Sequence, residues 1–202
     1  MKDIALHLMD IVQNSITADA TIITIKITVA PKSSSFVSPL KGKNLKNSSS
    51  LICEIIDNGR GMDPQFCKKV VDPFQTTRKT RDVGLGIPLL KQSCELAGGE
   101  LFIKSVPFEG TTVKAQFDVE SIDRIPLGDV AGTLKMLIMA NPEITWKVKF
   151  ISPGKEFSLD TNKVKNYLND IPLNNYEVLV WLEQKINEGI LKVFGGVLDE
   201  VN

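Results

Sequence analysis

Hydrophobic side chains recur with two different periods in the N-terminal part of the chain. Between residues 2 and 18 they return every three or four positions, the period of a helix that buries one side. Between residues 21 and 29, isoleucine and valine alternate with threonine and lysine, the period of a half-buried strand. Residues 51–56 are almost continuously apolar, as in a buried strand. The pattern therefore predicts a helix followed by two strands.

The same periods continue through the rest of the chain. Further helices are expected at residues 64–71, 127–140, 161–169 and 175–188, and one more helix is expected to end at residue 97. Strands are expected at residues 100–106, 111–119, 144–151 and 156–159. The Ser- and Lys-rich residues 31–50 favour a flexible loop, and residues 123–126 a linker. We expect an α/β domain over residues 1–122, followed by a small α+β region of unknown role over residues 123–202.

Composition narrows the classes of function. The 202 residues carry 24 basic and 24 acidic side chains, which argues against a general nucleic-acid or membrane-surface binder. No apolar run reaches membrane-spanning length, and an acid at position 3 is unlike a secretion signal. A single histidine excludes a multi-histidine metal site, and three cysteines without metal-ligand spacing favour reduced thiols. We expect a cytoplasmic protein with no nucleic-acid and no membrane partner.

The stretch from Asp57 to Met62 carries the clearest chemical signal. A strand that ends in Asp57-x-Gly59-x-Gly61 places one carboxylate at a sheet edge, followed by two residues without a Cβ. The glycines let a flat ligand approach the backbone, and a fixed carboxylate accepts a hydrogen bond from an exocyclic amine such as that of adenine. Taken alone, Asp-Asn-Gly is more typical of a surface turn than of a binding site.

Two further groups of residues add polar chemistry. His7, Asp10 and Asn14 lie three and four positions apart, so they share one face of the first helix, which is also the pattern of a solvated face. Gly84-Leu85-Gly86 precedes a helix, and a glycine pair at a helix start is a phosphate-binding arrangement, because free N–H groups and the positive dipole end face the anion.

In this order and spacing the three motifs resemble the GHKL ATPase superfamily, which includes gyrase, heat-shock chaperone, histidine-kinase and mismatch-repair ATPases. The motifs are Asp10-x-x-x-Asn14, Asp57-x-Gly59-x-Gly61 and Gly84-Leu85-Gly86. Residues 9–15 and 18–21 look most like the mismatch-repair branch, whereas 72–86 and 98–112 look like the histidine-kinase branch. The resemblance covers residues 1 to about 119. It implies the two-layer α/β sandwich of the Bergerat ATP-binding fold, a mixed sheet with helices on one face.

The resemblance implies a base-binding group at the end of the second strand. Asp57 would accept the adenine amine, with Gly59 and Gly61 giving the base room and Met62 packing against it. Thr111 would support that contact through its hydroxyl. ATP is the ligand implied.

A second group would hold the phosphates. The resemblance implies that Asn14 offers its amide oxygen to a Mg²⁺ ion bridging the phosphates, a suitable hard ligand. Gly84, Leu85 and Gly86 would supply backbone donors, and Arg78 would meet the terminal phosphate.

Asp10 stands where hydrolytic members carry a glutamate that orients or deprotonates the attacking water, and it is one methylene shorter. His7 is expected to orient neighbours or to be solvated. The upstream helix hairpin with a phosphoacceptor histidine, typical of sensor kinases, is expected to be absent, as in small stand-alone ATP-binding proteins.

Three functions remain open at this point. The first is a Mg-dependent ATPase or protein kinase acting on an unidentified protein partner. The second is an ATP-gated binding module with little turnover, and the third is an anti-sigma-like serine kinase. The motifs specify nucleotide binding and leave the fate of the γ-phosphate and the oligomeric state undetermined.

Overall fold

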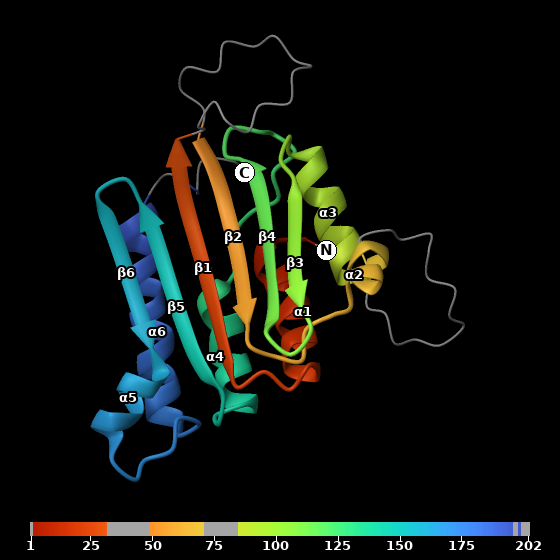
Figure 1. Cartoon of the computed structure of the whole chain (residues 1–202). Coiled ribbons are helices and arrows are strands. Elements are labelled where there is room, and N and C mark those ends of the chain that lie inside the picture. Colours follow the sequence, from red (N-terminus) through yellow and green to blue (C-terminus); the bar gives the residue numbers. More distant parts are fainter. Residues whose placement is uncertain (1, 32–48, 71–84, 196–197, 199–202) are drawn as a thin grey trace.

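The computed structural model describes residues 2–31, 49–70, 85–195 and 198 (Figure 1). In chain order its elements are α1 (Ile4–Thr17), β1 (Ile22–Pro31), β2 (Ser49–Asp57), α2 (Pro64–Val70), α3 (Gly86–Leu96), β3 (Leu101–Val106), β4 (Gly110–Asp118), α4 (Val130–Ala140), β5 (Thr145–Ser152), β6 (Lys155–Asp160), α5 (Thr161–Leu168) and α6 (Tyr176–Phe194). No helix in the described ranges has both the length and the apolar content needed to cross a membrane.

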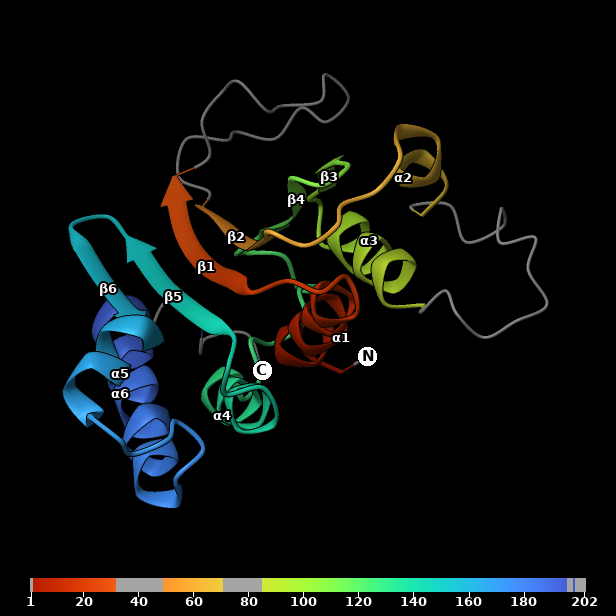
Figure 2. The same ribbon diagram turned by 60° about the horizontal axis from the view of Figure 1, so that its bottom comes forward.

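The strands form one six-stranded sheet in the order β3-β4-β2-β1-β5-β6. Strand β5 runs parallel to β1, and every other neighbouring pair within this sheet is antiparallel. Helices α1, α3, α4 and α6 lie on one face of it, with α1 between α3 and α4 (Figures 1 and 2). The expected two-layer α/β sandwich with a mixed sheet is confirmed.

Alternation along the central strands separates the two faces of the sheet. The isoleucines of β1 at 23, 25 and 27 are buried toward the helices, while Thr24, Lys26 and Thr28 are partly exposed on the other face. On that open face, Lys26 and Glu54 of β2 form an ion pair with a nitrogen–oxygen distance of 2.8 Å. The core therefore lies between the sheet and the helices, as the period-two pattern predicts.

The order and type of these elements agree with the hydrophobic pattern, while two boundaries differ from the expected ones by three residues or more. Helix α4 begins at Val130, three residues after the expected start, because the side chain of Asp129 caps it by accepting from the N–H of Gly132. Helix α6 continues to Phe194 through Gly189, where a Cβ would lie 2.6 Å from the ring of Phe157. This glycine lets α6 approach β6 closely. The expected loop at residues 31–50 lies outside the described residues over 32–48.

The C-terminal strands continue the sheet that begins in the N-terminal half. Strand β5 pairs with β1 from Ile22↔Thr145 to Thr28↔Ile151. The expected linker is tied to the N-terminal part, since the N–H of Ile4 donates to the carbonyl of Pro126 at 2.9 Å and buried Arg124 donates to the carbonyl of Val119. The division into residues 1–122 and 123–202 stays a prediction, but the strands on its two sides share one sheet.

A buried side-chain acceptor fastens β5 to the start of α5. The hydroxyl of Thr161, which is fully buried, accepts a hydrogen bond from the N–H of Trp146 at 2.8 Å. Trp146 is itself fully buried in the core. Leaving a buried N–H without a partner costs roughly 1–3 kcal/mol, which is more than a hydrogen bond contributes on balance when it forms. Loss of this acceptor should therefore destabilise the fold by more than the net energy of the bond.

We expect Thr161→Val to lower the free energy of unfolding by about 1–3 kcal/mol, because valine keeps the shape of threonine and removes the acceptor. Urea unfolding followed by tryptophan fluorescence measures this loss. Thr161→Ser, which keeps the hydroxyl, is the matched control and should lose clearly less. A Thr161→Val variant as stable as the parent, beside a destabilised Thr161→Ser, would show that the methyl group, and not the hydrogen bond, carries the effect.

Candidate functional site

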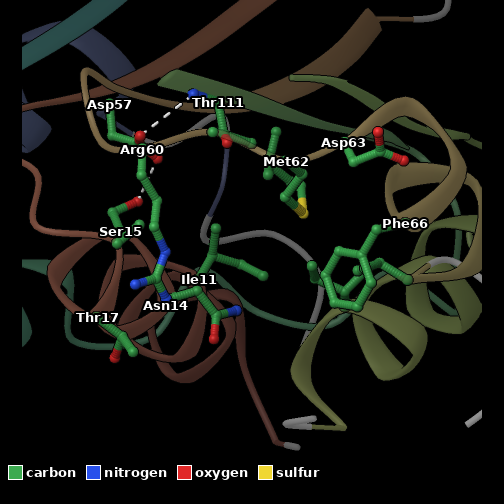
Figure 3. A pocket seen from close by; sticks show the side chains of 15 residues that line it. Ile11, Asn14, Ser15, Thr17, Asp57, Arg60, Met62, Asp63, Phe66 and Thr111 are labelled. Carbon is green, nitrogen blue, oxygen red and sulfur yellow. Dashed lines mark hydrogen bonds between the residues drawn. The ribbon is translucent and has the colours of Figure 1, made fainter. Parts of the chain in front are cut away.

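The carboxylate of Asp57 is held by three donors from three parts of the chain. Asp57 ends β2 and is 9% exposed. Its Oδ2 accepts from the hydroxyl of Ser15 at 2.6 Å, and its Oδ1 accepts from the N–H groups of Gly59 at 2.9 Å and Thr111 at 3.2 Å. Figure 3 shows the bonds from Ser15 and Thr111 converging on this carboxylate. Helix α1, the loop after β2 and strand β4 together fix its orientation.

The loop after Asp57 is fastened on both sides. The side-chain carbonyl of Asn58 accepts from the N–H groups of Thr21 and Ile22 at 2.9 and 2.8 Å, which ties the loop to the start of β1. Gly61 has φ +65°, and a Cβ there would lie 2.0 Å from the carbonyl oxygen of Val106. Glycine at this position is therefore required by both its dihedral angle and its contact with β3.

A hydroxyl pair continues the network behind the loop. The N–H of Met62 donates to the hydroxyl of Ser105 at 2.8 Å, and this hydroxyl lies 2.8 Å from that of Thr111. Ser105 and Thr111 are direct partners in the β3–β4 pairing. Thr111 therefore contacts Asp57 through its N–H and Ser105 through its hydroxyl.

These groups open onto a cavity of about 450 Å³, within the usual range for small-molecule sites. It lies between the end of α1, the loop after β2, α2, the first turn of α3 and strand β4, as its lining and Figure 3 show. The lining residues are Ile11, Asn14, Ser15, Thr17, Ala18, Asp57, Arg60, Gly61, Met62, Asp63, Phe66, Val70, Ile87, Thr111 and Val113. An apolar wall with a few polar groups suits a flat ring carrying a polar edge.

Asp10 stands where α1 meets the start of α3. A Cβ on Gly86 would lie 2.9 Å from the Cβ of Asp10 and 3.0 Å from its Oδ2, so the glycine permits the contact between the two helices. Burial raises the pKa of the Asp10 carboxyl above its usual range. Leu85, which precedes α3, is 67% exposed. Asp10 and the start of α3 are thus adjacent.

His7 is buried, with 1% of its surface exposed, so the expectation of a solvated side chain is wrong and an orienting role is left. Its Nε2 lies 3.3 Å from the hydroxyl of Ser93 on α3, while its Nδ1 has no hydrogen-bond partner among the residues that the structure describes. Burial lowers the pKa of His7 from 6.5 to about 4. The imidazole is therefore neutral at pH 7 and packs as an uncharged contact between α1 and α3.

The cavity brings five of the predicted residues to its wall: Asn14, Asp57, Gly61, Met62 and Thr111. Gly59 lies next to two of the lining residues, since a Cβ there would be 3.1 Å from Oδ1 of Asp57 and 2.7 Å from the carbonyl oxygen of Ala18. Asp10, Leu85 and Gly86 lie near the start of α3 and are not among the lining residues. Arg78 and Gly84 lie outside the described residues.

Sequence reasoning assigned no role to four residues that the structure places in or behind the cavity: Ser15, Arg60, Phe66 and Ser105. Ser15 did carry a signal, because it is a polar residue on the apolar stripe of the first helix and therefore needs a buried partner. The position of Ser105 beside Thr111 could be inferred from the β3–β4 pairing once the turn between these strands is known. For Phe66, half exposed on α2, the sequence offered no signal.

Comparison with protein families decides what kind of domain this is. The model of the histidine kinase-, DNA gyrase B- and HSP90-like ATPase family matches residues 2–121, more than half of the chain. The chain belongs to this ATPase family. The resemblance inferred from the three motifs is thereby confirmed. No curated protein matches the chain by sequence.

Solved structures are similar to this ATPase-family chain in fold. The ATPase domain of Aquifex aeolicus MutL complexed with ADP is 14% identical, with a TM-score of 0.44, over 91% of this chain and 88% of that one. The N-terminal domain of a DNA repair protein is 18% identical, with a TM-score of 0.48, over 97% of this chain and 58% of that one.

We expect the free energy of unfolding to fall by about 1–2 kcal/mol between pH 7 and pH 5 through His7 alone. The unfolded chain takes up a proton at His7 near pH 6.5, whereas the folded chain resists protonation down to about pH 4. The unfolded state therefore binds more protons in this window, and stability decreases as the pH falls.

Urea unfolding of the parent and of His7→Gln at the two pH values measures the effect. Glutamine does not titrate, so the variant should lack this part of the pH dependence while all other groups titrate alike. Identical pH dependences would show that His7 is not held neutral by the fold.

Proposed function

We propose that this ATPase-family chain binds MgATP in the cavity beside Asp57, and hydrolyses it slowly or transfers its phosphate to a partner protein. The observation that carries the proposal is the pattern of hydrogen bonds to the Asp57 carboxylate. An ionised carboxylate offers about four acceptor positions, and Ser15, Gly59 and Thr111 use three. The unused acceptor position lies on Oδ2, because Oδ1 accepts two of these bonds and Oδ2 accepts only the one from Ser15. It suits a single N–H donor such as the exocyclic amine of adenine.

Mg²⁺ would enter with the nucleotide. Among the described residues, no group of three or more His, Cys, Asp and Glu side chains is placed to hold a metal by itself. Mg²⁺ is commonly held by one or two protein oxygens together with phosphates, and the amide oxygen of Asn14, exposed at the cavity wall, fits that arrangement. When bound, the ion neutralises charge on the phosphates.

Asp10 is the proposed general base. Its contact with the start of α3 favours a phosphate end at this point, because the N–H groups of a helix start attract anions. Burial raises its pKa, which makes the carboxylate a better proton acceptor near neutral pH. Asp10 would accept the proton of a water attacking the γ-phosphate. Its short stem favours slow intrinsic turnover, and Gly84, Leu85, Gly86 and Arg78 stay proposed phosphate contacts.

We also propose a protein partner and a cellular location, both in general terms. Exposed aromatic side chains in the C-terminal region, Tyr167 at 87%, Tyr176 at 79% and Trp181 at 44%, favour an unidentified protein partner there. Balanced charge favours a cytoplasmic protein that binds neither nucleic acid nor membrane. The alternatives are an ATP-gated binding module and an anti-sigma-like serine kinase. Following the γ-phosphate label in cell extract, into free phosphate or onto protein, separates these activities.

We expect Asp57→Asn to lower the affinity for ATP at least tenfold, because the amide offers a weaker acceptor and competes as a donor. Asparagine keeps the size of the side chain, so circular dichroism should show the parental fold. The parent should also prefer ATP to GTP, since guanine carries a carbonyl where adenine carries the amine. Isothermal titration measures both affinities, with exposed Asp123→Asn as the control. Parental ATP affinity in Asp57→Asn would refute the assignment.

Asp10→Asn tests the fate of the phosphate. It should bind ATP with about the parental affinity and release phosphate on the order of a hundredfold more slowly, because a general base contributes that much or more. Phosphate release is followed with and without cell extract as a source of the partner. If Asp10→Asn hydrolyses ATP at the parental rate under both conditions, Asp10 is not the base, and the kinase and binding-module functions become the better candidates.

A further inference from the structure

Arg60, between the two glycines of the loop after β2, has a main chain that is fixed on both sides. Its N–H donates to the carbonyl of Ala18 at 2.9 Å, and its own carbonyl accepts from the N–H of Phe108 at 2.8 Å. One bond reaches the residue after α1 and the other reaches the turn between β3 and β4. The Cα of Arg60 therefore has a defined position at the edge of the cavity.

The side chain of Arg60 lines the cavity and extends from the loop toward α1 (Figure 3). Its guanidinium has a weak partner in Asp19, with a nitrogen–oxygen distance of 3.9 Å and side chains that are 62% and 87% exposed. Exposed pairs of this kind contribute little to stability. The guanidinium is therefore free to exchange Asp19 for another anion at small cost.

Charge in the cavity is unevenly distributed. Among the described residues that line it, Asp57 and Asp63 are acidic and Arg60 is the single basic one. Asp57 is occupied by its three donors, and its remaining acceptor position suits a neutral amine. A polyanionic ligand that enters this space meets one cation of the described wall, and that cation is Arg60.

We propose that Arg60 binds the phosphate chain of the nucleotide and so sets the preference of the cavity for phosphorylated adenine compounds over adenosine. The inference rests on the proposed ATP binding. A planar guanidinium donates two parallel N–H bonds to phosphate oxygens, which a single ammonium does not reproduce. The side chain leaves the loop that holds Asp57 and points toward the helix that carries Asn14, so it spans the base end and the proposed metal end.

The experiment compares adenosine, ADP and MgATP on the parent chain and on Arg60→Ala by isothermal titration. We expect Arg60→Ala to bind ADP and MgATP roughly tenfold more weakly and adenosine within about twofold of the parent. Arg60→Lys, which keeps the charge and loses the fork, should fall between the two. Lys185→Ala, which removes an exposed cation of α6 paired with Glu188, is the matched control and should bind like the parent.

Each other outcome overturns a different statement. An equal loss for adenosine and MgATP would make Arg60 a contact to the base or ribose. Unchanged binding of all three compounds would make it a solvated side chain. In both cases the parent still binds ATP, and the proposed function stands. A parent chain that binds neither adenosine nor MgATP would instead refute the proposed function itself.

Discussion

The architecture of the site depends on one buried carboxylate and the donors that surround it. Asp57 is only 9% exposed, and a buried polar group without hydrogen-bond partners is unfavourable. Its three donors come from α1, from its own loop and from β4. The same bonds that satisfy this carboxylate therefore join the helix layer to the end of the sheet. The cavity exists where these elements meet, and its acceptor is oriented before any ligand arrives.

The contact between α1 and α3 provides a second constraint, beside the first turn of α3 that lines the cavity. Gly86 allows Asp10 to lie against α3, and buried His7 lies beside Ser93 one turn earlier on α1. Both titratable groups are partly or fully removed from water, which raises the pKa of the acid and lowers that of the base. Because His7 is neutral at pH 7, its part of this contact costs less to bury than a charged group would, and it is more sensitive to acid than an apolar contact.

Sequence reasoning predicted the elements well because their hydrophobic periods are local and strong. The strand at residues 22–31 alternates cleanly, and the Asp57 motif follows a buried strand, so both could be placed from neighbouring residues alone. The strand order could not be obtained in this way, since the pairing of β1 with β5 joins residues more than a hundred positions apart. Within the site, the motif residues were found by type and spacing.

What the sequence missed in the site are relations between distant side chains. The bond from Ser15 to Asp57 spans 42 positions, and Ser105 reaches Met62 across 43. Gly86 was assigned to phosphate binding, and the structure adds a steric reason for it that no local pattern contains, namely the proximity of Asp10. Burial of His7 likewise depends on α3, which the spacing on α1 does not reveal.

The parallel pairing of β1 with β5 has a consequence for how this ATPase-family region can be handled in isolation. The family match ends at residue 121, whereas β5 begins at Thr145. A fragment cut at the end of the match would turn β1 from an inner strand into an edge, with a row of unpaired N–H and C=O groups beside a strand rich in isoleucine. Such edges recruit other chains. Self-association of a short fragment would then reflect its missing neighbour and not a native oligomer.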